Sequence, residues 1–154
     1  MITNSSYKRI RSARLNDLQS IMEILSSPAQ HSAIVSRTPE YIELQIDNFI
    51  VYCVDGDVVG CCETIQYADG SATEIASLAV DKSFRNQGIG SELVSEAVKE
   101  MRSRDFRLVF ALSTAVSHIF TQCGFVQISP EELPEEKRKN YEFQESIVYG
   151  RRLN

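Results

Sequence analysis

The sequence contains no tryptophan, only two histidines, and no long hydrophobic run. A membrane-spanning helix needs about 18 to 20 consecutive apolar residues, so we expect no membrane contact. The four cysteines are Cys53, Cys61, Cys62 and Cys123. They form no paired CxxC spacing, and with His31 and His118 they complete no zinc signature. Buried free thiols in a reducing compartment are therefore the better interpretation, and we predict no metal site.

The chain is also poor in positive charge, with a net charge of -5 and a pI near 5.1. Phosphate binding over a long surface needs a basic face, so we expect no nucleic-acid partner. Its 154 residues, 43% of them hydrophobic, suit one globular domain, and we assign 1–154 to it. Residues 1–14 are polar and hold no apolar signal stretch, which favours a cytoplasmic location.

The first third of the chain predicts one strand and two helices. A strand is expected over 7–13, and Asn16 can cap the helix that follows. The inner face of that helix would consist of Leu18, Ile21, Met22 and Leu25. Thr38 and Pro39 resemble an N-cap followed by proline at the first helical position. Ile42 and Ile46 would give this second helix its buried face.

The middle of the chain predicts an antiparallel meander and a long helix. Its strands would cover 49–54, 58–66 and 73–80. Asp55-Gly56-Asp57 is a hairpin signal between the first two. The helix is expected over 88–102, where apolar residues recur at helical spacing.

The last third predicts strands at 108–112, 125–128 and 141–149 and a short helix at 117–122, closed by Gly124. Residues 130–140 are charged and are expected to form a loop, because Pro134 limits any helix there. The resulting order is βααβββαβαββ. We therefore predict an α/β (α+β) fold with a mixed sheet of about seven strands and helices on both faces.

The segment Arg85-Asn86-Gln87-Gly88-Ile89-Gly90 lies between a strand and an amphipathic helix. The first turn of a helix has free backbone N–H groups and the positive end of the helix dipole, so this position suits an anion. Gly88 and Gly90 would let a phosphate approach those amides, and Arg85 would add a charged donor. The alternative is a tight turn without a ligand. The pattern is neither a Walker loop nor the dinucleotide motif GxGxxG.

Leu78-Ala79-Val80 followed by Arg85-x-x-Gly88-x-Gly90 resembles the pyrophosphate-binding segment of GNAT acetyltransferases, and the order of elements resembles the GNAT fold. The resemblance implies acetyl-CoA as co-substrate. The implied contacts are Leu78, Ala79, Val80, Arg85, Asn86, Gln87, Gly88, Ile89, Gly90 and Ser91. The backbone N–H of Leu78 or Ala79 would polarise the thioester carbonyl. The strand that ends at Val80 would splay from 108–112 to make room for pantetheine.

Three further segments resemble the acetyltransferase domain of N-acetylglutamate synthase. They are 34–38 with Tyr41, 74–80, and 112–141 with its Leu133-Pro134-Glu135-Glu136-Lys137-Arg138 run. The resemblance implies direct acetyl transfer to the α-amine of L-glutamate in a ternary complex. The product would be N-acetylglutamate, at the first step of arginine biosynthesis. It also implies a homodimer.

This resemblance would place Arg37, Ser77, Ser113 and Lys137 at the amino acid. Glutamate carries two carboxylates at neutral pH, so cations such as Arg37 and Lys137 suit its pocket. Glu74 is the predicted general base, because the attacking amine must lose a proton. Strand alternation puts Ser77 on the face opposite to Glu74 and Leu78 unless a bulge intervenes, and Glu63 is the reserve base.

The leaving thiolate has no obvious proton donor, because the aromatic residue on the short helix is Phe120. Ser117 or water could donate the proton. Alternatively no acid is needed, since a thiol with a pKa of about 8.5 leaves readily as the thiolate. Glu142 and Glu145 stand where the synthase family commonly has arginine. Two other functions stay open: a GNAT enzyme for another amine (another amino acid, a polyamine, an aminoglycoside or a protein N-terminus), and a non-catalytic acyl-CoA-binding module.

Overall fold

The computed structural model describes residues 6–26, 37–67, 70–114, 117–139 and 146–153. Its strands are β1 Lys8–Ser12, β2 Phe49–Val54, β3 Asp57–Gln66, β4 Ala72–Val80, β5 Leu108–Ser113, β6 Val126–Gln127 and β7 Ile147–Arg152. Its α-helices are α1 Leu18–Leu25, α2 Pro39–Leu44, α3 Ile89–Ser103, α4 His118–Gln122 and α5 Glu135–Lys139. Short 3-10 helices cover Leu15–Asp17, Ile46–Asn48, Lys82–Phe84 and Pro130–Glu132.

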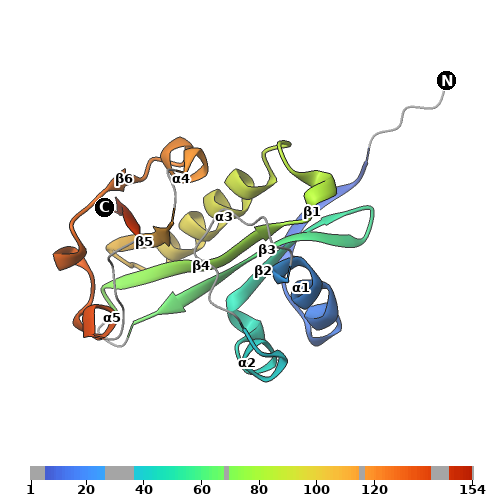
Figure 1. Cartoon of the computed structure of the whole chain (residues 1–154), viewed down its shortest axis with the longest axis horizontal. Helices are drawn as coiled ribbons and strands as arrows, with labels where there is room; N and C mark the ends of the chain where they lie inside the picture. Colours follow the sequence, from blue (N-terminus) through green and yellow to red (C-terminus); the bar gives the residue numbers. More distant parts are fainter. Residues whose placement is uncertain (1–5, 27–36, 68–69, 115–116, 140–145, 154) are drawn as a thin grey trace.

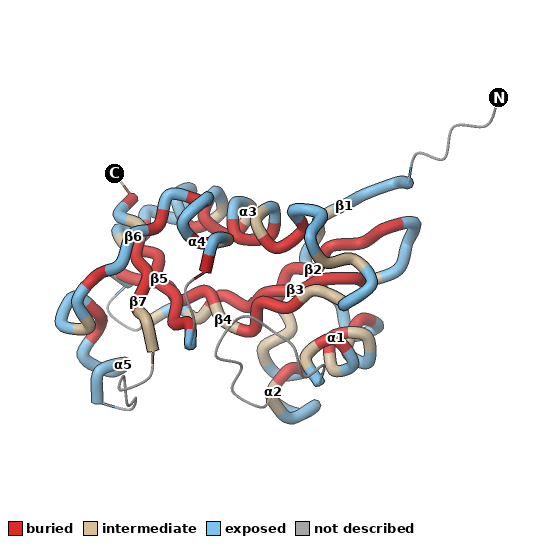
Figure 2. The backbone as a smooth tube through the Cα atoms, turned by 45° about the horizontal axis from the view of Figure 1, so that its top comes forward, coloured by how far each residue is buried: buried red, intermediate tan, exposed pale blue. Residues whose placement is uncertain are grey.

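All described strands join one mixed sheet in the order β1-β2-β3-β4-β5-β7-β6. The β4–β5 pair is parallel and the other pairs are antiparallel. Helices α3 and α4 cover one face, and α1 and α2 cover the other (Figure 1). The central strands are buried on both faces (Figure 2). The predicted fold class, a mixed sheet between helices, is confirmed.

The predicted hairpin forms where the sequence indicates it. β2 has the predicted bounds, and Asp55 and Gly56 both have positive φ, 52° and 88°. Two successive residues with positive φ make the turn that matches the twist of a two-residue hairpin. Glycine and aspartate tolerate this conformation, so the short turn fixes the β2–β3 register.

The two N-terminal helices begin differently. The prediction for α2 is confirmed: Thr38 caps it through a 3.1 Å bond from the Tyr41 N–H, with Pro39 in the first turn. The prediction that Asn16 caps α1 is wrong. Asn16 lies inside a 3-10 turn, and Asp17 instead accepts the backbone N–H of Arg14 at 2.8 Å. Asp17 takes this place because its carboxylate also pairs with the Arg11 guanidinium, at 2.7 Å.

Two C-terminal predictions are wrong, and part of a third lies outside the described residues. Residues 130–140 are not all loop, because α5 starts directly after Pro134, whose carbonyl accepts the N–H groups of Lys137 and Arg138. Proline is compatible with a helix start, where no N–H is required. The last described strand is β7, Ile147–Arg152, and the part of the predicted strand at 141–145 lies outside the described residues. The order of elements in the described residues is therefore βααβββαβαβαβ, with one more helix than predicted.

A β-bulge in β4 shapes the sheet around the site. Ser77 has φ of 51°, and the β3–β4 register shifts beside it, between Cys61 and Glu63. β4 separates from β5 shortly before the bulge: their pairing ends at Glu74 and Phe110, although both strands continue. The predicted splay between these strands is confirmed, and it opens a gap in the middle of the sheet.

Candidate active site

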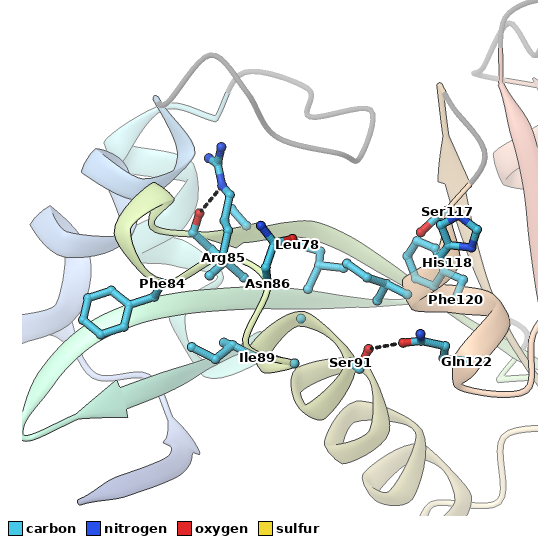
Figure 3. Close-up of a pocket in the computed structure, with 15 residues that line it drawn as sticks. Leu78, Phe84, Arg85, Asn86, Ile89, Ser91, Ser117, His118, Phe120 and Gln122 are labelled. Carbon is cyan, nitrogen blue, oxygen red and sulfur yellow. Dashed lines mark hydrogen bonds between the residues drawn. The ribbon is translucent and has the colours of Figure 1, made fainter. Parts of the chain in front are cut away.

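A cavity of about 600 Å³ lies at the gap between β4 and α4 (Figure 3). Its walls come from the end of β4, the loop before α3, the first turn of α3, and α4. The lining residues are Leu78, Ala79, Val80, Phe84, Arg85, Asn86, Gly88, Ile89, Gly90, Ser91, Ser117, His118, Ile119, Phe120 and Gln122. The space is large enough for an elongated organic ligand and is walled mainly by apolar side chains.

The N-terminus of α3 opens into this cavity. Gly88 is its N-cap, with φ of 82°, in the left-handed region that favours glycine. Gly90 permits the close approach of α4, because a Cβ there would stand 2.9 Å from the Ile119 Cδ1 atom. The 15-residue helix therefore presents free N–H groups and its positive dipole end to the cavity. This geometry suits a phosphate or pyrophosphate.

Nine of the ten residues predicted at the cofactor line the cavity. The exception is Gln87, which is exposed and is not among the described lining residues. Arg85 is held by a bond of 3.1 Å from its Nε to the Val80 carbonyl, and Ser91 donates to Gln122 at 3.2 Å (Figure 3). These bonds tie the loop to β4 and α3 to α4, so the cavity walls are fixed to each other.

The α4 wall carries a buried aromatic residue. Phe120 is 2% exposed and stacks on Tyr149 of β7, with ring centroids 5.7 Å apart. The Tyr149 hydroxyl accepts the Ser117 N–H at 3.0 Å. His118 is exposed and also lines the cavity. Sequence reasoning missed Phe84, Ile119 and Gln122 as lining residues. Ile119 and Gln122 could not be found because only the tertiary fold brings α4 beside the glycine loop.

Glu74 lies in a buried ionic cluster with Lys137. The Glu74 side chain is 6% exposed, and its Oε1 lies 2.9 Å from the Lys137 Nζ. The Tyr67 hydroxyl also donates to Oε1, at 2.8 Å. Burial, followed by the charge of Glu74, raises the pKa of Tyr67 well above its ordinary value. Glu74, the predicted base, is thus in direct contact with Lys137, which was predicted to bind the acceptor amino acid.

A second buried cluster surrounds Glu63, which is 1% exposed. The Ser77 hydroxyl donates to Glu63 Oε1 at 2.9 Å, the Tyr41 hydroxyl donates to Oε2, and the Arg37 guanidinium lies 3.4 Å from Oε1. The Arg37 guanidinium also stacks over the Tyr41 ring, 4.4 Å from its centroid. Burial, followed by the hydrogen bond to Glu63, raises the pKa of Tyr41 to about 12.

The two clusters occupy the same face of the sheet. Glu74 pairs with Ile65 across the β3–β4 ladder, two residues from Glu63, and the charge of Glu74 contributes to the raised pKa of Tyr41. Simple alternation would separate Ser77 from Glu74, and the bulge that the sequence analysis named as the exception is present at Ser77. The bulge turns Ser77 toward Glu63 and leaves Leu78 with the core on the α3 face.

Ser113 is fully buried at the end of β5, opposite Ile147 of β7, and it is not among the described residues that line the cavity. The Tyr41 hydroxyl donates to Glu63 and the Tyr67 hydroxyl donates to Glu74, but the sequence analysis gave these tyrosines no role. Alternation of Glu63 and Ile65 along β3, continued to Tyr67 directly after the strand, was the signal that could have placed Tyr67 beside Glu74.

The described residues contain no group of three or more histidine, cysteine, aspartate or glutamate side chains placed to hold a metal ion. Within the same residues, no helix is both long and apolar enough to cross a bilayer. The four cysteines are free and buried, as predicted. Burial raises the pKa of Cys61 to about 12 and that of Cys62 well above its ordinary value.

Comparison with curated proteins identifies relatives that are longer than this chain. An amino-acid acetyltransferase from Pseudomonas fluorescens is 30% identical over 144 residues, which cover 94% of this chain and 33% of that protein. A second, from Shewanella oneidensis, is 31% identical over 143 residues, 93% of this chain and 32% of that protein. The chain thus spans about a third of the length of these relatives.

Several solved structures have a fold similar to that of this chain. N-acetylglutamate synthase from Neisseria gonorrhoeae, in complex with coenzyme A and N-acetyl-glutamate, is 30% identical with a TM-score of 0.86 over 99% of this chain and 36% of that one. Rv2747 from Mycobacterium tuberculosis, in complex with CoA, shares the fold at 20% identity, with a TM-score of 0.82 over 95% of this chain and 99% of that one. The acetyltransferase (GNAT) family profile matches residues 18–125. Together with the predicted and observed order of strands, this match shows that the chain belongs to the acetyltransferase (GNAT) family.

Proposed function

We propose that this chain is an acetyl-CoA-dependent N-acetyltransferase whose acceptor is the α-amine of an amino acid, with L-glutamate as the first candidate. The observation that carries the proposal is the cavity between the end of β4 and α4, into which the N-terminus of α3 opens. Buried ionic clusters on the neighbouring face of β4 add groups suited to a charged amino acid. The names of the longer relatives support the same acceptor class.

The residues present fit acetyl-CoA. The pyrophosphate would be held by the backbone N–H groups at the start of α3, from Gly88 to Ser91, with Arg85 beside them. The apolar walls, including Leu78 and Ile89, suit the pantetheine arm. Bound there, acetyl-CoA supplies an activated acyl thioester. The backbone N–H of Leu78 or Ala79 would donate to its carbonyl oxygen, as the predicted oxyanion donor.

We assign Glu74 as the general base. An ammonium has no free electron pair, so the acceptor amine must transfer a proton before it attacks the thioester. Glu74 is buried on β4 four residues before Leu78, and Lys137 and Tyr67 hold its carboxylate in place. The amine would deliver its proton to Glu74, directly or through water. Glu63, in a comparable environment on β3, remains the reserve base.

The acceptor carboxylates would meet Arg37 and Lys137, which lie on the same face as Ser77. Each cation is already paired with a protein carboxylate, so the acceptor must share it. Ser113 was predicted at the same site and remains a proposal. For the leaving thiolate, Ser117 at the start of α4 or water is the donor we propose, since Phe120 has no proton to give.

The first test is release of free thiol from acetyl-CoA, followed with a chromogenic disulfide across amino acids, polyamines and peptides. We expect turnover with glutamate and a loss of at least about 100-fold in kcat for Glu74→Gln. Glu100→Gln, a change of an exposed carboxylate on α3, is the matched control and should retain full activity.

The outcomes separate the candidate functions. Turnover only with a polyamine, an aminoglycoside or a peptide would keep the acetyltransferase chemistry and reject an amino-acid acceptor. CoA binding by calorimetry without turnover of any acceptor would reject the enzyme and favour an acyl-CoA-binding module. The homodimer and the cytoplasmic location stay predictions, and light scattering on the purified chain tests the former.

A further inference from the structure

Glu63 is buried more completely than any other charged side chain among the described residues, and it lies next to a predicted acceptor cation. Its carboxylate accepts the Ser77 and Tyr41 hydroxyls as well as the Arg37 guanidinium. Two neutral donors hold the carboxylate independently of the arginine. The negative charge at Glu63 is therefore a fixed part of the site and not a mobile surface charge.

Arg37 is less completely satisfied than its partner. Its contact with Glu63 is 3.4 Å, long for a charge-assisted bond, and its Nε is buried with no hydrogen-bond partner among the described residues. The side chain is still 18% exposed. A buried guanidinium with an unpaired N–H can accept a further anionic ligand, and a carboxylate is the group whose geometry fits its fork.

From this juxtaposition we propose that Glu63 is a specificity-determining residue: its charge weakens the preference of the site for an amino acid with a side-chain carboxylate over the neutral amide. This inference rests on the proposed function. A carboxylate that binds Arg37 must lie close to Glu63 in a region of low dielectric, where like charges repel strongly. The neutral side-chain amide of glutamine can accept hydrogen bonds from the Arg37 guanidinium without being repelled by the Glu63 carboxylate.

Two expectations follow for the acceptor. The unmodified chain turns over glutamate and glutamine with kcat/KM values within about tenfold of each other. Removing the charge of Glu63 while keeping its shape raises the glutamate-to-glutamine ratio by about tenfold or more. Glu63→Gln is the suitable change, because the amide keeps the shape of the carboxylate: its oxygen can accept one of the two hydroxyls, and its NH2 group can donate to the oxygen of the other.

The experiment measures kcat/KM for glutamate and glutamine in the unmodified chain, in Glu63→Gln, in Arg37→Gln and in the double variant. Calorimetric binding of both amino acids to the CoA-loaded protein gives a second readout. If Glu63 acts through Arg37, the ratio rises in Glu63→Gln and does not rise further when the same change is made in the Arg37→Gln background. A merely structural role of Glu63 would lower both kcat/KM values together.

A ratio that stays unchanged or falls in Glu63→Gln, with turnover intact, overturns this inference and leaves the proposed function standing. A ratio that rises equally in the Arg37→Gln background also overturns it, because the effect would not pass through Arg37. Absence of both binding and turnover for all amino acids in the unmodified chain overturns the inference together with the proposed function.

Discussion

Single residues with positive φ occur where the chain must bend around the cavity. Gly88 adopts this conformation at the N-cap of α3, and Asn86 and Ser77 adopt it nearby. For a residue with a Cβ, the left-handed region costs about 1 kcal/mol or more. Ser77 and Asn86 bear this cost within the sheet and the loop. The local backbone around the cavity is thus less stable than it could be, and strain of this kind is typical of functional sites.

Gly88→Ala should weaken CoA binding by about tenfold and lower the free energy of unfolding by about 1 kcal/mol, or roughly 2–4 °C in Tm. Gly56→Ala is the matched control: it has a similar φ, 88° against 82°, and open space around a new Cβ, but it lies in the β2–β3 turn. Both variants should lose similar stability, measured by thermal unfolding. A similar loss of CoA affinity in both, measured by calorimetry, would contradict a role for Gly88 at the phosphate.

At the scale of elements, an ion pair fastens the first helix to the sheet. Asp17 precedes α1 and accepts two bonds from Arg11 of β1, at 2.7 and 2.9 Å, besides the Arg14 N–H. Its side chain is 8% exposed. The Arg11 guanidinium, helped by the Arg14 N–H, lowers the pKa of Asp17 below its ordinary 3.8. One carboxylate therefore sets both the start of the helix and its attachment to the edge strand.

Asp17→Asn should lower the free energy of unfolding near neutral pH by about 1–3 kcal/mol, because it leaves the Arg11 charge without its partner. Since the pKa of Asp17 is lowered in the folded state, its contribution is complete above about pH 4 and is lost as the pH falls further. Urea titrations from about pH 7 to 2 should show the difference between the two proteins shrinking below about pH 4. A difference that grows on acidification would contradict the assignment.

Most elements could be predicted from the sequence because their signals are local. Asp55-Gly56 fixes one turn, and Thr38-Pro39 fixes a helix start. The bulge at Ser77 could not be predicted, since no glycine marks it and it serves a contact with Glu63, 14 positions away. Contacts between distant positions were likewise not predictable among the residues proposed to bind the acceptor.

The Lys137–Glu74 pair joins positions 63 apart, and a helix at α5 that was expected to be a loop presents that lysine. The sequence therefore identified Lys137 and Glu74 separately. Only the tertiary structure shows that they neutralise each other.

For the molecule as a whole, the reactivity of the four buried thiols measures whether the core is folded. Cys61 and Cys62 are completely buried between the two helix layers, on opposite faces of β3. Burial raises the pKa values of both thiols, so very little reactive thiolate is present near pH 8. Their modification therefore requires the sheet to open.

In the native protein we expect Cys61 and Cys62 to react with a chromogenic disulfide only at the rate of global unfolding. In guanidinium all four cysteines should react at once. Mass spectrometry of the labelled peptides at increasing times, beside an unfolding-rate measurement, checks this. Rapid labelling of Cys62 under native conditions would show that the α3 face opens locally, and it would also complicate the thiol-release assay.

The short β4–β5 contact also has a consequence for how the chain folds. β2, β3 and β4 pair through neighbouring hairpins. In contrast, β5 joins this part of the sheet through only three parallel residue pairs with β4, and α3 is the crossover between the two strands. Contacts between distant parts of the chain form slowly, because the entropy of closing the intervening loop opposes them. The N-terminal meander can thus form early, and docking of the β5–β7–β6 segment comes late. The cavity is a product of that last step, so the binding site is absent from any partly folded form that lacks it.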